Sequence, residues 1–91
     1  MLRSQRYAIQ PRIRSMADDD GMVLLDIRAG KYYSLNKLGA LIWHKVEEGR
    51  PASEIASYLR TTFQISVEKA MEDLGLFLAD LEQKGLIHGA P

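Results

Sequence analysis

Apolar and polar residues follow two different periods along this chain of 91 residues. Up to about residue 35, apolar residues occur in short runs separated by turn-forming residues, which predicts β-strands. From residue 36 onward they recur every three or four positions, which predicts amphipathic helices. Three strands followed by three helices define an α+β fold, in which a three-stranded antiparallel sheet precedes a winged helix-turn-helix-like group of helices.

The three predicted strands are short and bounded by turn signals, and they cover residues 12–16, 22–27 and 31–35. Asp18–Gly21 is rich in turn-forming residues, and Gly30 is free to take a positive φ in the second turn. The nearly continuous apolar run at 22–27 predicts burial on more than one face. Tyr33 and Leu35 are predicted to share one face of the last strand. If that strand lies at a sheet edge, its unpaired N–H and C=O groups can template a visiting peptide.

Capping residues mark the boundaries of the three predicted helices. Asn36 and Ser66 are good N-caps, because their side chains can accept a hydrogen bond from a free first-turn N–H. Pro51 is predicted to open the second helix from a first-turn position. Gly49 and Gly85 are predicted to end the first and third helices.

Length and composition predict one domain over residues 11–88, with residues 1–10 and 89–91 as flexible ends. Hydrophobic residues make up 46% and charged residues 26% of the chain, which is ordinary for a soluble globule. The absence of cysteine excludes disulfides and thiolate chemistry and is compatible with a cytoplasmic location. No apolar run approaches about 18 residues, so no membrane-spanning segment is predicted.

Charge bears on nucleic-acid binding, which is the alternative function for a winged-helix order of elements. Twelve basic residues balance twelve acidic ones, so no global field attracts phosphates or an anionic membrane. Residues 67–84, which would form the reading helix, include five acids and two bases and would repel phosphates. No nucleic-acid or membrane partner is therefore predicted. Only the arginines near the N-terminus could compensate as a flexible arm, namely Arg3, Arg6, Arg12 and Arg14.

No constellation of residues predicts catalysis, a metal site or a cofactor. His44 and Glu48 are four residues apart on one helix, but a catalytic zinc site needs three protein ligands, so they are interpreted as an exposed pair. Asp18–Gly21 lacks the register and the closing glutamate of a calcium loop. The serines are not paired with a histidine in a nucleophilic motif. The chain is therefore predicted not to be an enzyme.

Leu76 departs from the apolar pattern of the third helix, because it lies about opposite the apolar stripe. Lys69, Asp73 and Asp80 flank it, and Phe77 lies at the edge of the stripe on the same side. An isolated exposed leucine is common on protein surfaces and is one interpretation. The other is an apolar spot on a side of the helix that faces a partner.

The run Leu25–Asn36, followed by Gly39 and Trp43, resembles the PqqD-like family. Its combination of Leu-Asp, Gly-x-Tyr, Leu-Asn and Trp is the most specific part of a resemblance that extends over about residues 13–88. Pro51 departs from the family, in which a Ser or Thr cap is common. Trp43 is interpreted as a core residue. Within the family, the chain is most similar to the stand-alone leader-binding protein of lasso peptide biosynthesis.

The resemblance implies a RiPP recognition element, a winged-helix-like domain that captures the leader of a ribosomally synthesised precursor peptide. In such domains the leader adds as a strand to the segment equivalent to 31–35 and lies against the last helix. The implied peptide-binding residues are Lys31, Tyr32, Tyr33, Ser34, Leu35, Lys69, Asp73, Leu76, Phe77 and Asp80.

The resemblance also implies protein partners and no cofactor. The captured leader would be presented to a separate leader peptidase, with a cyclase acting afterwards. The alternative within the family is a PqqD-type peptide chaperone for a radical-SAM enzyme. The oligomeric state stays open, because an exposed sheet edge can also pair with a second copy.

Overall fold

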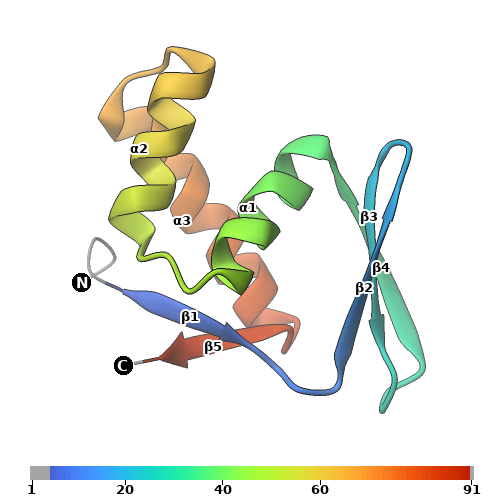
Figure 1. Ribbon diagram of the computed structural model, residues 1–91. Coiled ribbons are helices and arrows are strands. Elements are labelled where there is room, and N and C mark those ends of the chain that lie inside the picture. Colours follow the sequence, from blue (N-terminus) through green and yellow to red (C-terminus); the bar gives the residue numbers. More distant parts are fainter. Residues whose placement is uncertain (1–4, 91) are drawn as a thin grey trace.

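The computed structural model describes residues 5–90, which form two small antiparallel sheets and three helices (Figure 1). β2, β3 and β4 form one sheet in that order, and the terminal strands β1 and β5 pair to form the other. The predicted α+β order of a three-stranded sheet followed by three helices is confirmed. The elements are β1 Arg6–Ile9, β2 Ile13–Asp18, β3 Gly21–Asp26, β4 Lys31–Asn36, α1 Lys37–Glu47, α2 Ala52–Phe63, α3 Val67–Gln83 and β5 Ile87–Ala90.

The three-stranded sheet has two faces that differ in burial, since alternate side chains of a strand point in opposite directions. On the central strand β3, Met22, Leu24 and Asp26 are buried, whereas Leu25 on the other face is 40% exposed. The prediction that this strand is buried on more than one face is therefore wrong. The helices lie on one side of the sheet only, so the apolar residues of the opposite face stay in solvent (Figure 1).

The predicted helix starts are confirmed by their capping hydrogen bonds. The Asn36 side chain accepts a bond from the backbone N–H of Gly39 at 2.8 Å, and the Ser66 hydroxyl accepts one from that of Lys69 at 3.1 Å. These bonds satisfy N–H groups that have no partner within the helix. Pro51 is itself the N-cap of α2, one position before the predicted first turn.

The ends of the described chain form a sheet that the sequence did not predict. β1 pairs with β5 from Arg6 opposite Ala90 to Ile9 opposite Ile87. The prediction of flexible ends is thus wrong for residues 6–9 and 89–90, while residues 1–4 and 91 lie outside the described part. The pairing joins two four-residue strands from opposite ends of the chain, so neither carries a local signal long enough to reveal it.

The hydrophobic core lies between the helices and the inner face of the three-stranded sheet, and the β1–β5 sheet also contributes to it. Trp43 is 1% exposed, which confirms its interpretation as a core residue. No helix within residues 5–90 has the length and apolar character needed to cross a membrane. The largest fully buried side chains are Trp43, Met22, Leu24, Ile55, Leu74, Leu78, Leu81, Leu86 and Ile87.

Candidate peptide-binding groove

A groove of about 610 Å³ lies where β4 meets the helices. β4 forms one wall and α3 forms the other, and residues of α1 and α2 line the apolar interior between them. Most of its surface is apolar. The apolar side chains that line it are Tyr33, Leu35, Leu38, Ile42, Leu59, Phe63, Ile65, Leu76, Phe77, Leu81 and Leu86.

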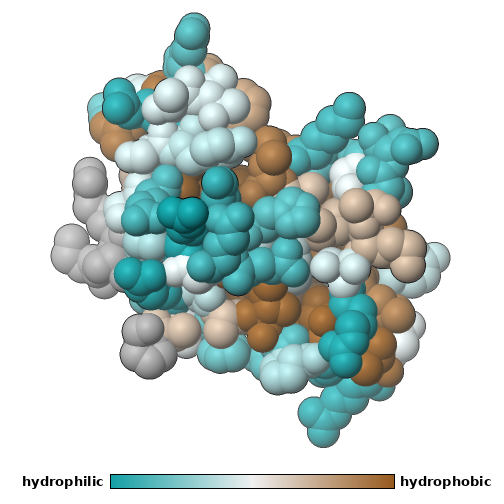
Figure 2. All heavy atoms as spheres, viewed as in Figure 1, coloured by the Kyte–Doolittle hydropathy of each residue, from teal (hydrophilic) through white to brown (hydrophobic). Residues whose placement is uncertain are grey.

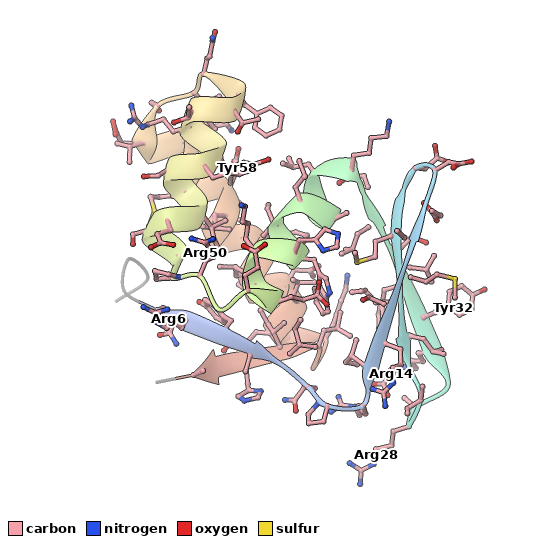
Figure 3. The ribbon with its side chains drawn as sticks, in the orientation of Figure 1. Arg6, Arg14, Arg28, Tyr32, Arg50 and Tyr58 are labelled. Atoms are coloured by element: carbon pink, nitrogen blue, oxygen red, sulfur yellow. The ribbon has the colours of Figure 1, made fainter. Side chains whose placement is uncertain are left out.

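β4 is an edge strand whose outer side has no strand partner among residues 5–90. Its side chains alternate, so Tyr33 and Leu35 are half-buried toward the core and the groove, as predicted. Tyr32 is 72% exposed, does not line the groove, and points away from the helices (Figure 3). The free N–H and C=O groups of β4 therefore lie beside an apolar groove on one face of the sheet only.

The α3 wall combines an exposed apolar residue with paired charges. Leu76 is 68% exposed and lines the groove, and Phe77 beside it packs partly against the core. Asp80 is 2.9 Å from the ammonium group of Lys84, which in turn lies 5.6 Å from the centroid of the Tyr33 ring. A cation and its carboxylate partner thus stand at the place where α3 approaches β4.

A partly buried ion pair connects the sheet to the segment that follows α3. Asp26 is 5% exposed, and its carboxylate lies 3.1 Å from the Nε of Arg12. The Nη2 of Arg12 donates to the carbonyl oxygen of Gly85 at 2.8 Å. The pKa of Asp26 is lowered because the backbone N–H of Ala29 donates to its carboxylate and because Arg12 does so as well. Arg12 thus joins the end of β3 to the segment that follows α3.

The structure brings seven of the ten sequence-predicted site residues together in the groove. They are Tyr33, Ser34, Leu35, Asp73, Leu76, Phe77 and Asp80. Lys31, Tyr32 and Lys69 lie outside its lining. Lys69 contacts the site indirectly, because its ammonium group is 3.2 Å from the carboxylate of Asp73.

Sequence reasoning missed several groove residues from the other helices, notably Leu38, Phe63, Ile65 and Lys84. Leu38 and Phe63 fit the apolar period of their helices, and that period is typical of core positions. The structure leaves them 42% and 46% exposed instead. An apolar residue in the first or last turn of an amphipathic helix is therefore a weak signal of a groove position, because helix ends often extend beyond the core.

Outside the groove, His44 and Glu48 form exposed ion pairs with different partners. The Nδ1 of His44 is 3.1 Å from the carboxylate of Glu47, whereas Glu48 pairs with Arg50 at 3.1 Å. The predicted pairing of His44 with Glu48 is therefore wrong in its partner. Within the described residues, no group of three or more His, Cys, Asp or Glu side chains is placed to hold a metal ion.

Fold and groove together define a small α+β domain with an open sheet edge beside an apolar cleft. The sequence profile of the family described as coenzyme PQQ synthesis protein D (PqqD) matches residues 21–87. The chain therefore belongs to the PqqD family, and the predicted resemblance is confirmed.

Two solved structures are similar to the chain over nearly their whole length. A lasso peptide synthetase B1 in complex with the leader peptide has a TM-score of 0.84 and 29% identity, over 94% of this chain and 99% of that one. TbiB1 in complex with the TbiA(beta) leader peptide has a TM-score of 0.84 and 31% identity, over 91% of this chain and 96% of that one. None of the curated proteins compared with the chain matches it significantly.

Proposed function

We propose that this chain is a recognition protein that binds the leader segment of a ribosomally synthesised precursor, of the lasso peptide class. The observation that carries the proposal is the unpaired edge of β4 next to an apolar groove. Two similar structures at 29% and 31% identity are complexes with leader peptides, which supports the same use of this surface. In this proposal the leader adds to β4 as a fourth strand and rests against α3.

Strand addition supplies orientation more than specificity. Each backbone hydrogen bond that the leader forms with β4 replaces bonds to water, so its net contribution is about 0.5–1.5 kcal/mol. Such bonds are the same for every sequence. They align the leader along β4 and determine which of its alternate side chains point into the groove.

Specificity comes from the side chains that enter the groove. Leu76 and Phe77 on α3 face Tyr33 and Leu35 on β4 across the groove, so an aromatic or aliphatic leader residue, or a proline, would be desolvated between them. Lys31 and Lys69, with Asp73 and Asp80, would set the register through charge at the margins. Because a disordered leader loses entropy when it binds, we expect an affinity in the micromolar range or somewhat tighter, roughly −8 to −10 kcal/mol.

The bound precursor would then be presented to a separate leader peptidase, and a cyclase would act on the released core. The chain itself has a recognition role and no catalytic one in this scheme, and it works in the cytoplasm as a peptide chaperone. The proposed step requires only capture and presentation of the peptide. This is the carrier role that the resemblance to the PqqD-like family implies.

An NMR titration of the full chain with a synthetic leader peptide tests the proposal. We expect backbone shift changes to concentrate on β4 and on the groove side of α3, around Asp73 to Lys84. Shift changes centred on β2 or on the β1–β5 sheet would contradict it. The proposal would also be contradicted if none of the lasso leader peptides tested binds to the chain.

The family description itself favours a second candidate, a PqqD-type chaperone for a radical-SAM enzyme. Both candidates use the same groove and differ in the enzyme that receives the peptide. A pull-down of purified leader peptidase or purified radical-SAM enzyme with the peptide-loaded chain separates them. DNA binding is the alternative from another class, and a steep salt dependence of duplex binding would reveal it.

A further inference from the structure

One end of the groove combines a cation with an aromatic ring. Tyr33 of β4 and Lys84, the C-cap of α3, both line the groove, and the ammonium group of Lys84 lies 5.6 Å from the centroid of the Tyr33 ring. The same ammonium group is 2.9 Å from the carboxylate of Asp80. Among residues 5–90, Lys84 is the one cation in the lining of the groove.

We infer that Lys84 is a specificity-determining residue, which selects a leader with an acidic side chain, Asp or Glu, at the groove position beside Tyr33. The inference deepens the proposed function and rests on it. The carboxylate of that leader residue would lie against the ammonium group of Lys84. Recognition would then combine the apolar contacts of the groove with one charged contact at its end.

The Lys84 end of the groove coincides with the β3–β4 turn. The guanidinium group of Arg12 donates both to the Asp26 carboxylate and to the carbonyl oxygen of Gly85, the residue after Lys84. Asp26 stands opposite Lys31, the first residue of β4. The end of α3 therefore lies near the start of β4, and a leader strand added to β4 would pass this place.

Two further cations make this end attractive to a carboxylate. Lys31 forms no ion pair within residues 5–90. It shares the Tyr33 face of β4, about 7 Å nearer the turn along the strand. Arg28 lies in the turn itself, at the lower end of the sheet, where hydrophilic residues project from the surface (Figures 2 and 3). An added negative charge is favoured there, and an added positive charge is repelled.

The ammonium group of Lys84 keeps donors free for such a contact. It carries three N–H donors, and within residues 5–90 the Asp80 carboxylate accepts one of them. The side chain of Lys84 is 43% exposed, which leaves the other donors to water. A leader strand beside Tyr33 would displace that water, and an ammonium group that loses water needs another acceptor. A carboxylate serves best, because hydrogen bonds between two ionised groups are the strongest.

Lys45 provides a matched comparison on another surface. Its ammonium group lies 4.6 Å from the centroid of the Tyr58 ring and 4.0 Å from the carboxylate of Glu48. Lys45 thus has the same kinds of neighbour as Lys84, but it does not line the groove. Replacement of either lysine by methionine keeps an unbranched side chain and removes the charge. A difference between the two replacements therefore reports the position of Lys84 in the groove.

Calorimetry with paired synthetic peptides and the full chain tests the inference. The peptides are versions of one lasso leader that binds the unmodified chain, with Glu or Gln placed in turn at each position. We expect one position at which the Glu peptide binds at least fivefold more tightly than the Gln peptide. This preference should fall below twofold in Lys84→Met, and it should persist in Lys84→Arg and in Lys45→Met.

Absence of a Glu preference at every position of a leader that does bind would overturn the inference and leave the proposed function standing. Equal weakening of the Glu and Gln peptides by Lys84→Met would overturn it too, because Lys84 would then act through packing. Tighter binding of a Lys peptide than of the Glu peptide would assign the charge selection to Asp80 instead. If no lasso leader binds the unmodified chain, the proposed function itself is contradicted, and the inference fails with it.

Discussion

The two edge strands of the three-stranded sheet both have unpaired backbone groups, but their surroundings differ. β2 and β4 each pair with β3 on one side and have no strand partner on the other within residues 5–90. β2 is exposed along its length after Ile13, and none of its residues lines the groove. β4 carries two half-buried side chains beside α3. Free backbone groups are thus present at both edges, and an adjacent apolar groove at only one.

The comparison teaches that an open edge is not sufficient for peptide binding. Backbone hydrogen bonds to a visiting strand contribute little net free energy, because water already satisfies the edge. Burial of apolar side chains contributes roughly 25 cal/mol for each Å² removed from water, and the edge of β2 offers no cleft for such burial. In the proposed function, the groove beside β4 therefore decides which edge the leader uses.

The largest effect is expected from the core that supports both edges. Trp43→Ala should lower the free energy of unfolding by about 3–5 kcal/mol, because it removes a fully buried aromatic side chain. For a chain of this size, such a loss should leave the domain largely unfolded. Circular dichroism with urea denaturation measures the change. A folded variant that has lost leader binding would show that Trp43 belongs to the site.

Proline substitution compares the two edges directly. Ser34 on β4 and Ser15 on β2 stand opposite adjacent residues of β3, Val23 and Leu24. Adjacent residues of a central strand bond to opposite neighbours, and the β2–β3 hairpin closes with a two-residue turn at residues 19–20. The N–H group of each serine should therefore point away from β3, toward the open side of its own edge strand.

Ser34→Pro should therefore weaken leader binding at least tenfold, or about 1.4 kcal/mol, because it deletes an edge donor and stiffens the strand. Ser15→Pro is the matched control and should leave leader affinity within twofold. Calorimetry measures both affinities, and circular dichroism checks that both variants fold. Equal losses in the two folded variants would remove the distinction between the edges.

A charge in the groove tests the apolar contribution alone. Leu76→Asp should weaken leader binding by more than about 1 kcal/mol with the fold intact, since an exposed apolar contact becomes a charge in a desolvated cleft. Val67→Asp introduces the same charge on α3 outside the groove and should have no effect on affinity. Unchanged calorimetric affinity of Leu76→Asp would remove this residue from the site.

The smallest effect concerns the ion pair between the sheet and α3. The pKa of Asp26 is lower in the folded chain than its ordinary value, so its carboxylate stabilises the fold above about pH 4, and this contribution is lost as the pH falls through the folded pKa. In Asp26→Asn, the free energy of unfolding should therefore depend less on pH below about pH 4. Acid unfolding followed by the fluorescence of Trp43 measures this dependence. An identical acid limb in both proteins would show that the pair does not contribute.

The sequence alone determined much of the fold and pointed to part of the lining of the groove. Asn36 and Ser66 mark helix starts by local hydrogen bonding, and Leu76 is conspicuous because it breaks a helical period; both signals lie within a few residues along the chain. Local chemistry of this kind is readable without knowledge of distant contacts.

Only the tertiary structure decided which surfaces face one another. It brought Leu38 and Phe63 to the groove and paired segments from the two ends of the described chain as β1 and β5. Each outcome depends on packing between segments far apart in sequence, whereas periodicity reports only the direction of a side chain relative to its own element. The helices pack on one face of the sheet, and this arrangement separates the groove from the opposite face.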